Sequence, residues 1–129
     1  MLISAYEKGY FMNNIINVFK LLSDETRLRI ILLLKDEELC VCQITGILEI
    51  SQPKASKALS KLRDLNLVTD TRKDKFVFYS LNENNPLLIH ILDYLNSNIK
   101  TYPQLEEDST RIQLKNGFLT NCGTSTIKL

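Results

Sequence analysis

Apolar residues along the first hundred positions recur at helical spacing and divide the chain into amphipathic segments. Four of them between residues 13 and 22 lie three or four positions apart, which predicts a first helix with one apolar face. Ser23 and Asp24 then supply a helix cap. The run 25–36 that follows is apolar on most sides, as in a buried helix. We interpret it as the central core helix.

A short third helix is expected from about residue 40 to 48, followed by a turn at 49–51 and a fourth helix to about residue 65. Ser51 is the predicted N-cap of the fourth helix, and Pro53 falls in its first turn, where a missing N–H costs nothing. Apolar residues from Ala55 to Leu65 form a stripe along one face of this helix, and its opposite face is polar and basic.

Two runs with a period of two, 67–71 and 76–81, are separated by the polar residues 72–75, which predicts a β-hairpin with a positive tip. A fifth helix starts after residues 84–86 and carries apolar residues along one side as far as residue 99. Beyond residue 103 the periodicity is weak. The pattern therefore predicts an arm at 1–12, a mainly α winged helix-turn-helix domain at 13–100 with its small β-hairpin, and a tail at 101–129.

The first and fifth predicted helices carry apolar stripes that a core of this size cannot bury completely. One monomer also offers few contacts to bases. We therefore expect a homodimer formed through these two helices, and a two-fold dimer reads a palindromic operator in double-stranded DNA.

Composition fits one globular domain, with 129 residues of which 44% are hydrophobic and 24% charged. No apolar run approaches the roughly 20 residues needed to span a bilayer, and no signal peptide is evident. We therefore expect a cytoplasmic protein with no membrane partner. Three cysteines, two of them nearly adjacent, argue against a disulfide framework and for thiol chemistry or metal binding in a reducing compartment.

Basic residues concentrate in the fourth helix and the hairpin. Residues 51–79 hold seven bases and three acids, a charge of +4 within a chain of net charge +1. Such a patch is an electrostatic footprint for nucleic acid, although a solvated charged face is the alternative for any single lysine. The candidate DNA-binding residues are Ser51, Gln52, Lys54, Ser56, Lys57 and Lys61 on the fourth helix, and Arg72, Lys73 and Lys75 on the hairpin.

Cys40 and Cys42 open the third helix, which packs beside the expected recognition helix. Residues two apart on a regular helix point roughly 200° apart, so these sulfurs can share a ligand only at a frayed first turn or if the ligand deforms the helix. Thiolates select soft, thiophilic ions. The alternative is that both cysteines are small buried hydrophobic residues.

The stretches FKLLSDETRLRI (19–30), ELCVC (38–42) and SQPKAS (51–56) resemble the arsenical-repressor (ArsR/SmtB) family of metal-sensing winged-helix repressors. The resemblance covers about residues 18–95. It implies a homodimer that binds operator DNA without a cofactor. It also implies release when arsenite, antimonite or a soft divalent ion binds the third-helix thiols.

Several residues depart from the family pattern. A third cysteine usual three positions after the second is replaced by Thr45, and Gln43 stands where an acid is common. Cys122 is then the only further thiol in the chain, and we take it as the candidate third ligand, from the same or the partner subunit. His90 and Asp93 are too few for the fifth-helix zinc site of other members.

The leading hypothesis is thus a repressor that senses As(III) or Sb(III) through Cys40, Cys42 and Cys122. The alternatives are a cadmium, lead or zinc sensor, which needs a fourth ligand, and a thiol-redox switch, in which so short a spacing strains a disulfide. We do not expect an enzyme, because the sequence has no histidine near the thiols and no glycine-rich phosphate loop.

Overall fold

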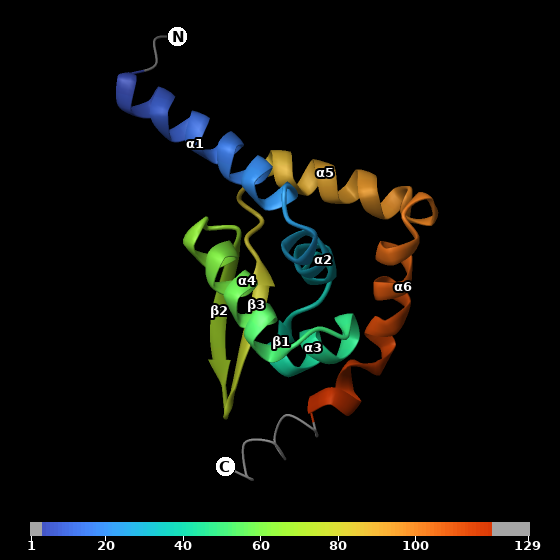
Figure 1. Cartoon of the computed structure of the whole chain (residues 1–129). Helices are drawn as coiled ribbons and strands as arrows, with labels where there is room; N and C mark the ends of the chain where they lie inside the picture. The colour runs from blue at the N-terminus through green and yellow to red at the C-terminus, as the bar shows by residue number, and fades with distance from the viewer. Residues whose placement is uncertain (1–3, 120–129) are drawn as a thin grey trace.

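The computed structural model describes residues 4–119 of the chain. Its elements, in chain order, are α1 (Ala5–Leu22), α2 (Glu25–Leu34), β1 (Leu39–Cys40), α3 (Val41–Leu48), α4 (Gln52–Asp64), β2 (Val68–Lys73), β3 (Phe76–Leu81), α5 (Pro86–Ser97), the 3-10 helix η1 (Ile99–Thr101), α6 (Pro103–Arg111) and the 3-10 helix η2 (Ile112–Leu114). Figure 1 shows α2 at the centre, with α4 and the hairpin on one side and α6 on the other. The predicted mainly α, winged helix-turn-helix fold is confirmed.

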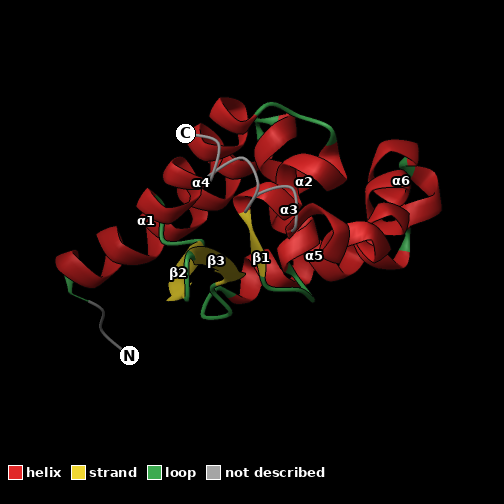
Figure 2. Cartoon of the chain, turned by 90° about the horizontal axis from the view of Figure 1, so that it is seen from below, coloured by secondary structure: helices red, strands yellow, loops and turns green. Residues whose placement is uncertain are grey.

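The core lies where the predicted apolar faces converge on α2. Ile30 and Ile31 of α2 are fully buried, as are Ile44 of α3, Leu59 of α4 and Leu88 of α5. These residues come from four of the helices drawn in red in Figure 2 and belong to one hydrophobic cluster, whose packing holds α3 against α4. The helix-turn-helix is therefore held by the same core as the rest of the domain.

Three side chains cap helices where the sequence predicted a helix start. Asp24 accepts a hydrogen bond from the Arg27 backbone N–H (2.9 Å), and Ser51 accepts one from Lys54 (3.3 Å). At the start of α5, the Asn85 side chain accepts a hydrogen bond from the Leu88 backbone N–H (3.1 Å). Each carboxylate, hydroxyl or amide oxygen satisfies an N–H that has no partner within its helix.

The sheet has one strand that the sequence did not predict. Its order is β1-β3-β2, all antiparallel, and the two-residue strand β1 pairs Leu39 with Tyr79 and Cys40 with Phe78. The β2–β3 pairing continues to Lys73 and Phe76, so the hairpin turn is shorter than the predicted residues 72–75. Asp74 holds the turn in the left-handed region (φ 57°), which Asp tolerates.

Secondary structure extends beyond both predicted domain boundaries. Helix α1 begins at Ala5, so the first helix starts eight residues before the predicted residue 13 and includes much of the segment expected to form the arm. In the predicted tail, Pro103 starts α6, and residues 115–119 are helical again. Leu105 and Asp108 of α6 are buried against the domain. Within the described residues, no helix has the length and apolar character needed to cross a membrane.

Candidate DNA interface and thiol site

The polar face of α4 presents the predicted base-reading residues. Gln52, Lys54, Lys57 and Lys61 are exposed, and Ser56 is half-buried. Gln52 donates a hydrogen bond to the Ser56 hydroxyl (2.9 Å), which orders both side chains at the start of the helix. This end of a recognition helix enters the major groove in helix-turn-helix proteins.

A groove between α4 and the start of α2 gathers further positive charge. Lys54, Lys57 and Lys61 line it together with Arg27, against two carboxylates, those of Asp24 and Asp64. Phosphates bind well where lysines and a helix start converge. This groove adds Arg27 to the candidate contacts, a residue that the α4 pattern alone did not indicate.

The hairpin β2–β3 lies beside α4 (Figure 1) and exposes Arg72, Lys73 and Lys75 as predicted. Lys73 is ion-paired with Glu38, the residue two positions before Cys40. The Lys73 ammonium lowers the pKa of Glu38, and a hydrogen bond from the Ser80 hydroxyl (3.2 Å) acts in the same direction. Glu38 therefore links the tip of the hairpin to the strand that carries a thiol.

Cys40 and Cys42 lie with their sulfur atoms 3.3 Å apart. This is possible because Cys40 is not helical: it ends β1 and is the N-cap of α3, with φ −92° and ψ 170°. Cys42 follows in the first turn. The two sulfurs therefore approach each other at the start of the helix, one of the two arrangements that the sequence analysis considered. Cys40 is 2% exposed and Cys42 is half-buried.

The thiol pair is tied into its surroundings by Gln43. The side-chain oxygen Oε1 of Gln43 accepts a hydrogen bond from the Cys40 backbone N–H (3.0 Å). The side-chain nitrogen Nε2 of Gln43 donates one to the Lys115 backbone carbonyl (3.3 Å). Gln43 is itself buried. Cys122, the third predicted ligand, lies outside the described residues. Among the residues described, no group of three or more Cys, His, Asp or Glu is arranged to hold a metal ion.

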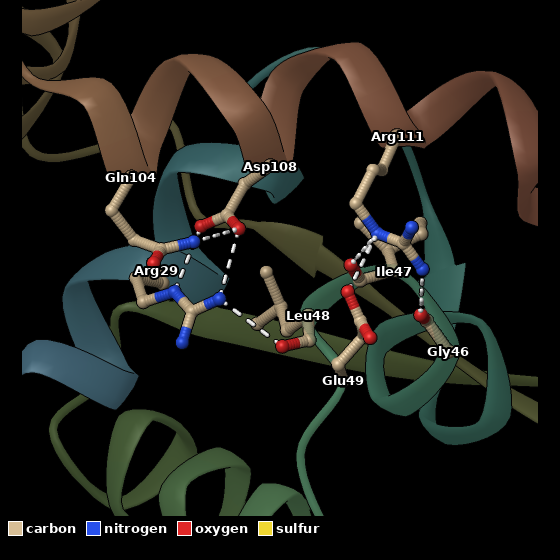
Figure 3. Close-up of polar contacts among 8 residues, drawn as sticks. All are labelled: Arg29, Gly46, Ile47, Leu48, Glu49, Gln104, Asp108 and Arg111. Atoms are coloured by element: carbon tan, nitrogen blue, oxygen red, sulfur yellow. Dashed lines mark hydrogen bonds and ion pairs between the residues drawn. The ribbon is translucent and has the colours of Figure 1, made fainter.

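Helix α6 binds the other end of α3 (Figure 3). Arg111 donates hydrogen bonds to the carbonyls of Ile47 (2.7 Å) and Gly46 (2.9 Å), and it is ion-paired with Glu49 (3.6 Å). The last carbonyls of a helix have no partners within it, so Arg111 completes the C-terminus of α3. Glu49 adopts a left-handed conformation at the turn of the helix-turn-helix (φ 57°).

A second contact joins α6 to α2. Arg29 forms a bidentate pair with Asp108 (2.8 and 2.9 Å) and also donates to the Leu48 carbonyl (3.1 Å). Asp108 raises the pKa of Arg29 through this pairing. Gln104 donates to Asp108 as well (Figure 3). The sequence analysis missed Arg29, Asp108 and Arg111, although Pro103 followed by an acidic first turn was a helix-start signal.

Helix α5 places His90 on the surface and Asp93 next to Lys35, the C-cap of α2 (3.0 Å). The hydrogen bond from the Lys35 ammonium to Asp93 raises the pKa of Lys35. Asp93 is therefore engaged in an ion pair between helices.

Comparison with known proteins places these features in a family. Residues 24–70 match the model of the family described as bacterial regulatory protein, arsR family. The arsenic resistance transcriptional regulator ArsR1 of Pseudomonas putida is 43% identical over 90 residues, which cover 67% of this chain and 70% of that protein. The chain belongs to the arsR family. The arsenical resistance operon repressor of Escherichia coli is 47% identical over 72 residues, 55% of this chain and 62% of the repressor.

Solved structures agree with this family assignment. HlyU from Vibrio cholerae superimposes with a TM-score of 0.60 at 30% identity, over 65% of this chain and 89% of HlyU. Members of the arsR family are DNA-binding transcriptional regulators and not enzymes. This arsR-family protein is accordingly a winged-helix, DNA-binding transcriptional repressor.

Proposed function

We propose that this arsR-family repressor senses As(III) or Sb(III) through the α3 thiols and releases its operator when the ion binds. The observation that carries the proposal is the 3.3 Å separation of the Cys40 and Cys42 sulfurs. The structure records Cys40 as a free thiol and Cys42 as disulfide-bonded, so the two sulfurs can chelate one ion once Cys42 is reduced. Relatives named for arsenic resistance support the same class of inducer.

The sulfur separation favours a pyramidal ion over a tetrahedral one. With metal–sulfur bonds of about 2.3 Å, a tetrahedral site holds its sulfurs about 3.8 Å apart. At the 3.3 Å of this pair, the same bonds enclose an angle of about 92°. Trivalent arsenic and antimony, which carry a lone pair, bind three thiolates at angles near a right angle. The spacing of the pair as it lies is therefore closer to that of a pyramidal As(III) site than to that of a tetrahedral Zn(II) site.

A third sulfur completes such a site, and Cys122 is our candidate for it. It lies four positions after Phe118, whose ring lies against Gly46 of α3. Gly46 and Cys42 are four residues apart on one helix face, about 6 Å from each other. A four-residue chain spans up to roughly 14 Å, so Cys122 of the same subunit can reach the thiol pair.

DNA binding is assigned to the face described above. We propose that Ser51, Gln52, Lys54, Ser56 and Lys57 read base edges, and that Lys61, Arg72, Lys73 and Lys75 contact the phosphate backbone. Binding of the ion affects this face through α3, because α3 packs directly on α4. Displacing the first turn of α3 would therefore tilt α4 in the groove.

We also propose that the repressor acts in the cytoplasm as a two-fold homodimer on a palindromic operator. Helix α1 exposes Ile15, Ile16 and Phe19, the last at 58%, and α5 next to it exposes Tyr94. Such a patch favours a second apolar surface. Phe19→Glu should yield a particle with the mass of one chain by light scattering and should weaken operator binding.

The deciding experiment is an operator-binding titration of Cys40→Ser/Cys42→Ser against As(III), Sb(III), Cd(II), Pb(II), Zn(II) and peroxide. The double variant should bind DNA like the wild type but should no longer release it with As(III) or Sb(III). Thr45→Ser, on the same helix, is the matched control. Release of the wild type by Cd(II) or peroxide alone would replace the proposed inducer, and loss of DNA binding in the double variant would make the thiols structural.

A further inference from the structure

Two arginines that lie outside the helix-turn-helix bind the last turn of α3 (Figure 3). We define the α3 brace as Arg29 of α2 together with Asp108 and Arg111 of α6. We propose that the α3 brace positions α4 for reading bases, so that α6 contributes to operator affinity and specificity from the opposite side of α2 (Figure 1). This inference rests on the proposed role of α4 in base reading.

The α3 brace supplies hydrogen-bond donors that the end of α3 lacks. The last four carbonyls of a helix have no partner within it, and in α3 these belong to residues 45–48. The first of them accepts bonds from backbone N–H groups of the following turn. The other three accept bonds from guanidinium groups: Gly46 and Ile47 from Arg111 (2.9 and 2.7 Å), and Leu48 from Arg29 (3.1 Å). The end of α3 is thus completed by side chains of α2 and α6.

The donors of the α3 brace are themselves fixed in place. Arg29 is held by its bidentate pair with Asp108, which is buried. Arg111 binds two successive carbonyls with one planar guanidinium group, and this two-point geometry restricts its orientation. The last turn of α3 therefore has a defined position relative to α2 and α6.

The turn after α3 transmits this position to α4. It has only three residues, and the first of them, Glu49, has a left-handed backbone (φ 57°). This conformation is strained for a residue with a side chain, and it persists where the surrounding structure holds it. Arg111 pairs with Glu49 (3.6 Å) and holds the two carbonyls before it. A shift of the last turn of α3 would therefore displace the start of α4, where Gln52 and Lys54 lie.

Base reading is more sensitive to such a displacement than phosphate binding. A bidentate contact with a base edge depends on exact geometry and favours the correct base by about 5- to 150-fold. A lysine contact with phosphate tolerates a shift, because the ammonium is a point charge on a flexible stem. Loss of the α3 brace should therefore weaken binding to operator more than binding to random DNA.

Arg111 gives variants that test this positioning role. Arg111→Met keeps a long side chain but removes the donors, whereas Arg111→Lys keeps the charge without the planar fork. Lys100→Met is the matched control, because it removes one positive charge from an exposed residue of η1, the element next to α6. Gln52→Ala tests the reading face itself.

The test is fluorescence anisotropy of the full-length protein, without As(III), on two duplexes of equal length. One is selected from a random-sequence pool by the wild type, and the other has a scrambled sequence. Arg111→Met should bind the selected duplex about ten-fold more weakly or worse, and the scrambled duplex within about two-fold of wild type. Its salt dependence should be unchanged, because no phosphate contact is lost. Arg111→Lys should lie between Arg111→Met and wild type, and Lys100→Met should keep the wild-type ratio of the two affinities.

An unchanged ratio of the two affinities in Arg111→Met would overturn the inference. An equal loss on both duplexes by folded Arg111→Met would also overturn it, because Arg111 would then act on DNA binding as a whole. If circular dichroism shows Arg111→Met unfolded, Arg111→Lys decides between the same outcomes. Failure of the proposed reading face gives a different result, since Gln52→Ala would then keep the wild-type preference for the selected duplex.

Discussion

Replacing Asp108 by alanine tests whether α6 is an integral part of the domain. The Asp108 side chain is 4% exposed and pairs in bidentate fashion with Arg29, whose side chain is 13% exposed. Removal of the carboxylate leaves the Arg29 guanidinium buried with only the Leu48 carbonyl as a partner among these contacts. The substitution also frees the Gln104 amide.

The expected cost follows from the burial of the pair. Breaking a buried ion pair from one side costs about 3–5 kcal/mol, since the remaining charge is desolvated without compensation. Arg29 keeps one hydrogen bond, so we expect about 3 kcal/mol for Asp108→Ala. For a domain of this size, 1 kcal/mol shifts Tm by about 3–5 °C, which gives a decrease of about 10 °C.

Urea unfolding of Asp108→Ala measures this cost, and an exposed ion pair of α5 supplies the control. Asp93→Ala removes the partner of Lys35, but Asp93 is 57% exposed, so its loss should cost less than about 1 kcal/mol. Replacing both partners of the buried pair, Arg29→Met with Asp108→Leu, should cost less than Asp108→Ala alone, because no charge is left buried.

Equal small losses in Asp108→Ala and Asp93→Ala would refute the reasoning. If Asp108→Ala loses less than about 1 kcal/mol, α6 detaches easily from the domain and exposes Arg29 to water. The loss of stability is then limited to the free energy with which α6 docks on the domain. Hydrogen exchange of the α6 amides would then show them unprotected in the wild type as well.

Three further predictions concern DNA binding and the recognition helix. Glu38→Gln should remove the carboxylate that competes with phosphate for Lys73, tighten operator binding and steepen the dependence of log K on log salt by up to about 0.9. Lys73 lowers the pKa of Glu38 below its usual value of 4.5, so the ion pair is present above that value and is lost only as the pH falls through the lowered pKa. The difference in operator affinity between Glu38→Gln and wild type should therefore be constant between about pH 6 and 8. Lys61→Gln should make the salt dependence shallower by about 0.9 on operator and random DNA alike, as a phosphate contact requires; an effect on operator alone would mean that Lys61 reads a base. Ser51→Ala should cost about 1 kcal/mol in urea unfolding through loss of the cap on Lys54, and an unchanged midpoint would show that water replaces it.

Local patterns were sufficient for most of the fold. The apolar stripe of α4 and its Ser51 cap are signals within a few residues of each other, and both are found where the sequence predicted them. Strand β1 was missed because two residues, Leu39 and Cys40, are too short to show a period. Its formation depends on β3, almost forty residues later in the chain.

Helix α6 was missed for a different physical reason. It is mostly polar, and its position is fixed by Arg29 binding Asp108 and by Arg111 binding the carbonyl of Ile47. These contacts join residues that are 79 and 64 positions apart. A single sequence shows no sign of which arginine will find which acceptor, so polar docking of this kind cannot be read from periodicity.

The thiol site shows how one residue can decide what a motif does. The i, i+2 spacing alone left open whether the two sulfurs could meet, and the extended backbone of Cys40 brings them together. That backbone is extended because Cys40 is also the last residue of β1, paired with Phe78 of the hairpin. In the proposed mechanism, an ion that pulls on Cys40 therefore acts on two elements at once. It moves α4 through the packing of α3 and moves the basic hairpin through the sheet and the Glu38–Lys73 pair. Base contacts and phosphate contacts should then weaken together.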